Sequence, residues 1–182
     1  MKTIVKTIFI IILFLFGLYL LLPLEEFPRE PIGAIVSNEP ADVEDINRRG
    51  YFTNFTRSDV ISHYKDEFKI SIFGVNIFPV RLNYPPEESK LLIRDQTRST
   101  FLEELVFPFR ESLFINGFEP KEDKDVIVVN REKYRQKIIV KHNASKTLPR
   151  FILGMLSVIF IYLFISNIYD TVGNSLKKFK NK

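Results

Sequence analysis

The sequence predicts an α+β domain, a small antiparallel sheet covered by helices, flanked by an N-terminal and a C-terminal transmembrane helix. Two apolar segments without charge, Thr7–Leu24 and Phe151–Tyr169, lie near the ends of the 182-residue chain. Between them, short β-rich runs alternate with segments of helical periodicity, which is typical of an antiparallel sheet with helices on one face. The average composition, 46% hydrophobic and 26% charged, hides this segregation.

Residues 1–24 are predicted to form the first transmembrane helix. Because a helix rises about 1.5 Å per residue, roughly 20 apolar residues cross a hydrocarbon core of about 30 Å. The run Ile4–Leu24 is long enough, Pro23 ends it, and Glu25 and Glu26 return the chain to water. A cleaved signal peptide is the alternative, but the run exceeds the usual length of a signal-peptide core and no A-x-A-like cleavage site follows. An uncleaved anchor is therefore expected.

Residues 149–169 are predicted to form the second transmembrane helix. Pro149 suits the first helical turn, where no backbone donor is lost. Arg150 and Tyr169 suit the two membrane interfaces. The alternative is a core helix of a soluble protein, but a domain this small could not bury a helix that is apolar on every face.

The basic flanks predict that both termini are cytoplasmic and that the central domain lies outside. Lysine and arginine are retained on the cytoplasmic side, whereas long loops are translocated largely regardless of charge. Lys141, Lys146 and Arg150, close to the outer end of the second helix, weaken this prediction. The tail, 170–182, outweighs them and is also expected to contact anionic lipid. Its lysines are Lys177, Lys178, Lys180 and Lys182.

The charge of the central region excludes a general nucleic-acid-binding surface. Residues 25–148 carry 19 Lys and Arg and 21 Asp and Glu, so the net charge of +4 comes from the flanks. The chain has no cysteine, which excludes disulfides and thiolate zinc sites. The expected partners are membrane lipids and other proteins of a prokaryotic envelope, without nucleic acid. Self-association into a homo-oligomer is left open.

The central region is divided into an extended, proline-containing lead-in, 25–50, and an α+β domain, 51–148. The lead-in is expected to hold at most a short strand at Ile32–Val36. The first elements expected in the domain are a helix Asp59–Glu67, started by Ser58, and a hairpin of strands 70–74 and 77–84. A long helix Pro86–Phe107 and a second helix Phe109–Asn116, ended by Gly117, should follow. The last elements expected are strands Asp125–Asn130 and Tyr134–Val140 around a turn at Arg131–Glu132.

The phenylalanine-rich segment Thr97–Pro120 is the most unusual stretch. Its aromatic side chains are expected to form core beneath a helix pair kinked at Pro108. The functional alternative is an apolar groove for a partner or lipid, with nearby arginines able to hold a carboxylate or phosphate. The residues of that candidate groove are Arg94, Arg98, Phe107, Phe109, Arg110, Phe114 and Phe118.

No pattern of catalytic or metal-binding residues is found, so no catalytic residue, cofactor or metal ligand is expected. The chain has two histidines, His63 and His142, far apart in sequence. Both are expected to be solvated, as is the adjacent pair Glu103 and Glu104. An acid–base site would require one histidine to meet two carboxylates across a cleft.

These observations favour a non-enzymatic membrane protein that presents an extracytoplasmic interaction domain, as an accessory or assembly subunit of an envelope complex. The first alternative is an extracytoplasmic module that binds or senses a small molecule or lipid. The second is a membrane-associated enzyme.

Overall fold

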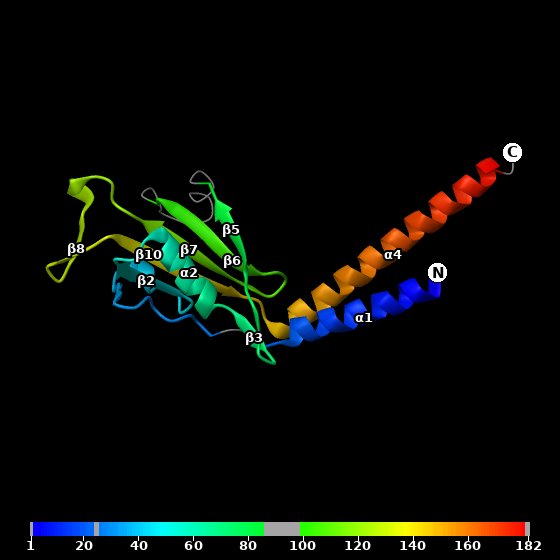
Figure 1. The fold of residues 1–182 in the computed structure, drawn as a ribbon, viewed down its shortest axis with the longest axis horizontal. Helices are drawn as coiled ribbons and strands as arrows, with labels where there is room; N and C mark the ends of the chain where they lie inside the picture. Colours follow the sequence, from blue (N-terminus) through cyan, green and yellow to red (C-terminus); the bar gives the residue numbers. More distant parts are fainter. Residues whose placement is uncertain (1, 24–25, 86–98, 181–182) are drawn as a thin grey trace. The chain divides into compact units, whose positions relative to one another are not determined.

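In the computed structural model, which describes residues 2–23, 26–85 and 99–180, the chain divides into two units (Figure 1). One unit consists of the terminal helices, α1 (Lys2–Leu21) and α4 (Thr147–Lys180). The other, Leu24–Ala144, is the α+β domain. Its described part begins within the segment expected to be an extended lead-in.

The domain is built on a six-stranded antiparallel sheet in the order β1-β2-β10-β7-β6-β5. Two small hairpins, β3–β4 and β8–β9, stand apart from it. The elements are β1 (Ile35–Val36), η1 (Pro40–Asp42), β2 (Arg48–Thr53), α2 (Arg57–Glu67), β3 (Ile70–Ile72), β4 (Val75–Ile77), β5 (Val80–Tyr84), β6 (Phe101–Phe107), β7 (Glu111–Phe118), η2 (Asp123–Asp125), β8 (Ile127–Val129), β9 (Glu132–Tyr134) and β10 (Gln136–Ala144). The prediction of an α+β class with an antiparallel sheet is confirmed.

Helix α2 covers one face of the sheet (Figure 1). The prediction of a helix at Asp59–Glu67 is confirmed. The helix begins two residues earlier, at Arg57, in a capping box, because the Thr56 hydroxyl accepts from the Asp59 amide and the Asp59 carboxylate accepts from the Thr56 amide. The buried side chains of α2 are those of Val60, Ile61 and Tyr64. Within the described part of the domain α2 is the single α-helix on the sheet, where several had been expected.

The prediction of helices in the phenylalanine-rich segment is wrong over its described part. Residues 101–107 form β6 and residues 111–118 form β7, and Pro108 lies in the turn that joins them. Both faces of β6 are buried, and both carry apolar side chains and one of the adjacent glutamates, Glu103 or Glu104, so its sequence lacks the alternation that identifies a half-exposed strand. The remainder of the expected long helix, 86–98, lies outside the described residues.

Gly117 is a strand residue and does not end a helix. It pairs with Phe101 of β6, and a Cβ at Gly117 would lie 2.1 Å from Phe101 Cε1. The Phe101 ring therefore occupies the space that a side chain on β7 would need. The Arg57 guanidinium lies on the same ring, 5.0 Å from its centroid.

The pair Glu103 and Glu104 is buried, contrary to expectation, because adjacent strand residues point to opposite faces of a buried sheet. Glu103 is fully buried on the α2 face, where Arg57 Nε and Arg81 Nη2 each donate to its Oε1 at 2.7 Å. Glu104 lies on the other face and accepts a hydrogen bond from the Tyr84 hydroxyl. Each carboxylate thus has the donors that a buried charge requires.

The predicted hairpins form with shifted turns. The first turns at Phe73–Gly74, and the strand expected at 77–84 is divided between β4 and β5. The last hairpin turns at Asn130–Arg131, after which β10 separates from β9 and enters the main sheet. A short strand is present in the lead-in at Ile35–Val36, as expected.

Within the helical unit, α1 and α4 pack through small residues. Gly17 and Gly154 are both buried, and a Cβ at Gly154 would lie 2.6 Å from Leu20 Cδ1. The rings of Phe9 and Tyr162 stack at 4.0 Å. Another small residue of α4, Ser157, is exposed and donates to the Leu153 carbonyl of its own helix. Helix α4 continues beyond the predicted end at Tyr169 into the basic tail.

Arg150 joins the two helices at the end where α1 stops. Its Nε donates to the Leu20 carbonyl at 2.7 Å and its Nη2 to the Leu22 carbonyl at 2.5 Å. The last carbonyls of a helix have no partner within it and carry the negative end of the helix dipole. A buried arginine at this position is therefore explained by helix capping.

Substitution of Gly117 by alanine should destabilise the domain by about 1–3 kcal/mol, because the new methyl group overlaps the buried Phe101 ring. The measurement is the denaturant midpoint of the full-length protein in detergent, monitored through the circular dichroism signal of the sheet. Adding Phe101→Leu to Gly117→Ala should recover part of the loss. A double variant no more stable than Gly117→Ala would contradict the overlap as its cause.

Candidate binding groove

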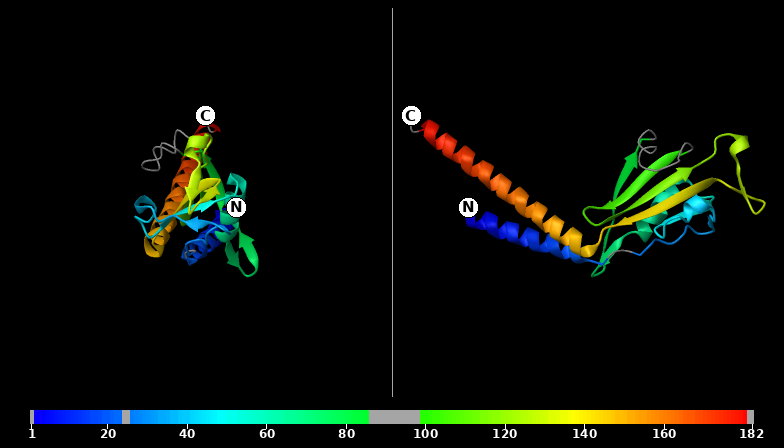
Figure 2. Two further views of the ribbon diagram at one scale, coloured as in Figure 1. Left: turned by 90° about the vertical axis from the view of Figure 1, so that its left-hand side faces the viewer. Right: turned by 180° about the vertical axis from the view of Figure 1, so that it is seen from behind.

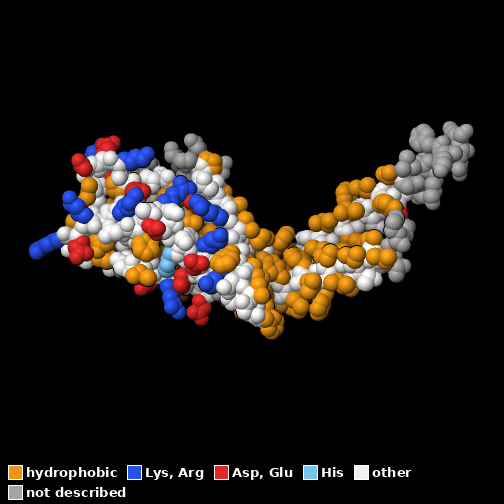
Figure 3. Space-filling model, viewed as in Figure 1, with side chains coloured by type: hydrophobic (Ala, Val, Ile, Leu, Met, Phe, Trp, Pro, Cys, Tyr) orange, Lys and Arg blue, Asp and Glu red, His pale blue; other side chains and the backbone are white. Residues whose placement is uncertain are grey.

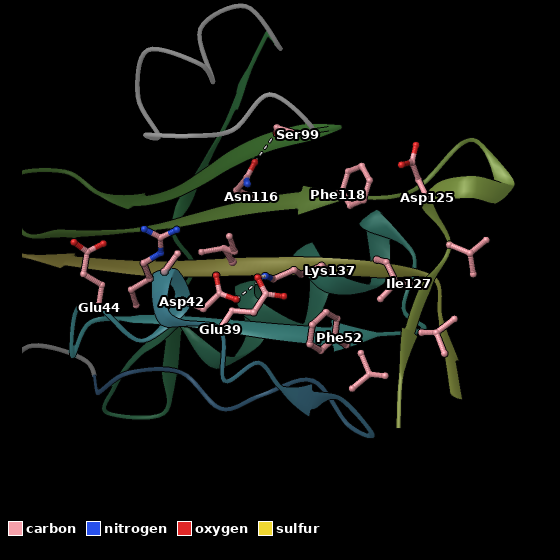
Figure 4. Close-up of a pocket in the computed structure, with 16 residues that line it drawn as sticks. Glu39, Asp42, Glu44, Phe52, Ser99, Asn116, Phe118, Asp125, Ile127 and Lys137 are labelled. Carbon is pink, nitrogen blue, oxygen red and sulfur yellow. Dashed lines mark hydrogen bonds and ion pairs between the residues drawn. The ribbon is translucent and has the colours of Figure 1, made fainter. Parts of the chain in front are cut away.

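An open groove of about 790 Å³ lies on the sheet face opposite α2 (Figure 4). Strands β2, β10 and β7 form its floor, and η1 and the η2–β8 segment line its margins. The residues that line it are Glu39, Ala41, Asp42, Glu44, Arg48, Phe52, Ser99, Asn116, Phe118, Asp125, Val126, Ile127, Val128, Val129, Lys137 and Ile139. The groove therefore collects side chains from segments widely separated in sequence.

Strand register determines which side chains form the floor. Lys137 of β10 lies between Phe52 of β2 and Phe118 of β7, and its ammonium group lies 5.6 Å from the Phe52 ring centroid. Ile139, two residues along, lies beside Asn116 on the same face. The intervening Ile138 points to the other face and is fully buried in the core. The floor is thus a mixed surface, with aromatic and aliphatic groups around one cation.

A fixed charge cluster stands at the η1 margin. Lys137 Nζ lies 2.7 Å from Asp42 Oδ2 and 2.7 Å from Glu39 Oε2, as Figure 4 shows. The Ser37 hydroxyl donates to the Asp42 carboxylate at 2.6 Å, and Asp42 is only 1% exposed. The carboxylate occupies the space above Gly50, where a Cβ would lie 2.5 Å from Asp42 Oδ2. The Lys137–Asp42 ion pair is therefore held in place, and it presents charged groups at a defined position in the groove.

Arg48 contributes a donor at the same margin. Its Nε is buried and has no hydrogen-bond partner among the residues that the structure describes. The other margin is apolar, and Val128 of β8 is 56% exposed there. Together, four carboxylates (Glu39, Asp42, Glu44, Asp125) and two cations (Arg48, Lys137) line the groove, which is acidic overall. Such a surface is suited to a ligand with apolar and basic groups.

The structure does not bring the residues of the predicted groove together. Phe118 lines the observed groove, and Phe114 lies on the same sheet face, where it stacks with Tyr84 at 6.3 Å. Phe107 is buried in the core, whereas Phe109 is exposed in the β6–β7 turn. The separation follows from strand geometry, since side chains three or seven residues apart share a helical face but fall on opposite faces of a strand, whereas Phe114 and Phe118, four apart, share one face.

The remaining residues of the prediction lie elsewhere. Arg110 is buried beside Glu111. Arg94 and Arg98 lie outside the described residues, as do Lys182 and the side chains of the other tail lysines, Lys177, Lys178 and Lys180. Sequence reasoning missed Phe52, Asp42, Lys137 and Ile139. The alternation of Lys137 and Ile139 with Gln136 and Ile138 could have indicated a strand with two different faces. It could not have indicated which strands lie beside it.

A second polar cluster, Arg110, Glu111 and His142, is buried on the α2 side of the sheet. Glu111 accepts from Arg110 Nη2 at 2.8 Å and from His142 Nε2 at 3.1 Å. The Phe68 ring meets the imidazole edge to face at 5.5 Å. The prediction that His142 is solvated is wrong. Burial raises the pKa of Glu111, but the hydrogen bonds from His142 and Arg110 outweigh it and hold the pKa below its ordinary value.

The other histidine makes a different contact. His63 Nε2 lies 3.0 Å from the Arg29 carbonyl, and its ring is half-buried against Phe55 and Tyr64. Among the described residues neither histidine meets two carboxylates, and no group of three or more His, Cys, Asp or Glu is placed to hold a metal ion.

Comparisons of the chain with protein-family models, with curated proteins and with solved structures found no match.

Glu111→Gln should destabilise the protein by about 3 kcal/mol at pH 7, because it leaves Arg110 buried without its carboxylate. Since the folded-state pKa of Glu111 lies below the ordinary 4.5, its contribution is complete above that value and is lost as the pH falls through the folded-state pKa. Denaturant midpoints of the two proteins should therefore converge in acid.

Glu119→Gln is the matched control for this prediction. Glu119 pairs with Arg135 at 2.7 Å, but both side chains are partly exposed, so its loss should change the stability by only about 0–1 kcal/mol at any pH. Equal effects of the two substitutions at pH 7 would contradict the importance of the buried cluster.

Proposed function

We propose that the protein spans a membrane twice, through α1 and α4. Both helices are long and apolar enough to cross a bilayer, over Ile4–Leu21 and Thr147–Val172. Figure 3 shows hydrophobic side chains over the terminal helices, whereas acidic and basic side chains gather on the domain. Only 11% and 6% of the two windows are buried. The core helix of a soluble protein would be mostly buried, so this exposure supports a lipid-facing role.

The packing of α1 supports an anchor that is retained. Its residues Gly17 and Leu20 contact α4, and Arg150 of α4 binds the carbonyls at its end. A removed signal peptide would take with it the two carbonyls that Arg150 binds. Arg150 is thereby accounted for as a structural residue, which removes one of the three cations that opposed the orientation with both termini cytoplasmic.

The function that the geometry supports best is protein–protein interaction by an extracytoplasmic domain, as an accessory or assembly subunit of an envelope complex. The observation that carries this proposal is the open groove on the sheet face opposite α2. Its mixture of exposed apolar side chains and fixed charges is typical of interaction surfaces. Its length across three strands fits an extended segment, apolar and basic, from a second protein.

The enzyme alternative lacks a supporting observation. It requires a histidine that faces two carboxylates across a cleft, and the described His142 contacts one carboxylate in a buried cluster. The groove, in turn, contains an ion-paired lysine whose two carboxylate partners hold it in place. We therefore propose no reaction for this protein.

The orientation can be tested by labelling, because the chain has no cysteine of its own. We expect Lys124→Cys, at an exposed position of the domain, to react with a membrane-impermeant maleimide in intact cells. Lys180→Cys, in the basic tail, should react only after the membrane is permeabilised. The reverse pattern would contradict the proposed orientation, and reaction of both positions in intact cells would contradict the two spans.

The groove can be tested by crosslinking in cells, purification in mild detergent and mass spectrometry. Val128→Arg places a bulky cation on the apolar margin and should reduce recovery of the partner about tenfold or more. Ile32→Arg is the matched control, since Ile32 is 83% exposed and lies outside the groove. Equal recovery of the same proteins by both variants would contradict the groove as the binding site.

A further inference from the structure

The β3–β4 hairpin exposes apolar side chains that the core does not use. Residues Ile70–Val80 contain no charge. Phe73, at the tip, is fully exposed, and exposed apolar residues follow it along the segment. These are Val75, Ile77, Phe78 and Val80. A continuous set of exposed apolar side chains indicates a surface that contacts an apolar partner or phase.

The backbone at the tip makes the choice of phenylalanine more unusual. Phe73 and Gly74 have φ values of 48° and 82°, a turn that favours Asn-Gly because a bulky side chain is strained at positive φ. The β8–β9 hairpin has the same pair of positive φ values, 52° and 71°, but places Asn130 and Arg131 there. The two turns share positive φ values at both central positions and differ in chemistry, so the aromatic tip is not required by this turn.

A second aromatic tip has the same character. Phe109, in the turn between β6 and β7, has a φ of 63° and is 64% exposed. Among the described residues, four that are not glycine have positive φ, and two of them are exposed phenylalanines at turns.

Both tips lie at the end of the domain where the chain leaves for α4. The Phe68 ring, at the end of α2, contacts Phe107 and His142, each at 5.5 Å, and β3 begins two residues later. Ala144, the last residue of β10, pairs with Glu111 next to the β6–β7 turn. The β8–β9 hairpin lies at the opposite end of the domain (Figure 2).

The short covalent connection allows this end to approach the bilayer. Helix α4 begins at Thr147, three residues after Ala144, and three residues span at most about 11 Å. Because α4 is proposed to enter the membrane, an apolar tip at this end is within reach of the lipid surface. Lipid is thus an apolar phase that could cover the exposed tips. The flanking cations suit the same layer, since Lys65 Nζ lies 5.5 Å from the Phe78 ring centroid and Lys69 precedes the hairpin.

We propose that the β3–β4 hairpin and the β6–β7 turn insert their phenylalanine tips into the interfacial layer of the bilayer that α1 and α4 span. This inference rests on the proposed membrane spans. The tips give the domain a contact with the lipid besides its two covalent tethers, and so limit its rotation about them. The groove margin formed by the η2–β8 segment lies toward the opposite end of the domain and remains in water, accessible to a partner.

The test uses tryptophan as the reporter, because the chain contains none. The full-length variants Phe73→Trp, Phe109→Trp and Arg131→Trp are reconstituted separately, one chain per nanodisc, in lipid with or without bromine on the upper part of the acyl chains. An aromatic group at an interfacial depth of about 5–10 Å should show blue-shifted emission and about twofold or greater quenching by the bromines. We expect this of Phe73→Trp and Phe109→Trp, and water-like, unquenched emission of Arg131→Trp.

Each other outcome overturns the proposal. If either Phe73→Trp or Phe109→Trp is quenched no more than Arg131→Trp, that tip does not enter the lipid. A blue shift without quenching would show a tip buried against protein. Extraction of the chain from membranes by alkaline carbonate would overturn the two-span proposal itself, a failure distinct from an unquenched tip in a chain that stays with the bilayer.

The variant Phe73→Asn separates insertion from folding. Asparagine tolerates positive φ, so this variant should be at least as stable as the native chain. In Phe109→Trp discs it should reduce the quenching, because one of the two contacts is lost. Unchanged quenching together with unchanged stability would contradict joint insertion of the two tips.

Discussion

The pairing of β10 with both β2 and β7 is the constraint on which the rest of the domain depends. Strand β10 joins β2 to the β6–β7 hairpin, and its alternating side chains serve two surfaces. Ile138 and Val140 enter the core beneath α2, while Lys137 and Ile139 form the groove floor. A slip of one residue would exchange these two sets, so the core and the groove are specified by the same register.

Buried charge reinforces this register. The domain has no cysteine, and four of its described carboxylates, Asp42, Glu103, Glu104 and Glu111, are buried with specific donors. A pairing that moved one of them would leave a charge without a partner in a medium of low dielectric. The contacts therefore discriminate against alternative pairings more than they add to the stability of the correct one. Arg150 has the equivalent role in the helical unit, where it satisfies carbonyls that α1 cannot.

The two ends of the domain differ in chemistry although they use similar turns. Phenylalanine occupies the strained tips at the end from which α4 leaves, whereas asparagine and arginine occupy the turn at the other end. The groove extends toward the polar end, with η1 and β8 at its margins. This division suits a tethered domain that contacts lipid with one end and a partner with the other.

The sequence by itself determined the features that depend on local composition. The apolar runs near the two ends, the α+β class, α2 and the existence of the hairpins follow from length, periodicity and turn residues. The sequence did not determine that residues 101–118 form the β6–β7 hairpin, because a strand buried on both faces loses the alternation that would identify it. Only the tertiary structure decided the groove, the buried Glu111–His142 contact and the placement of Phe73 and Phe109 at one end of the domain, because each depends on strand pairings and packing between distant segments that local pattern does not encode.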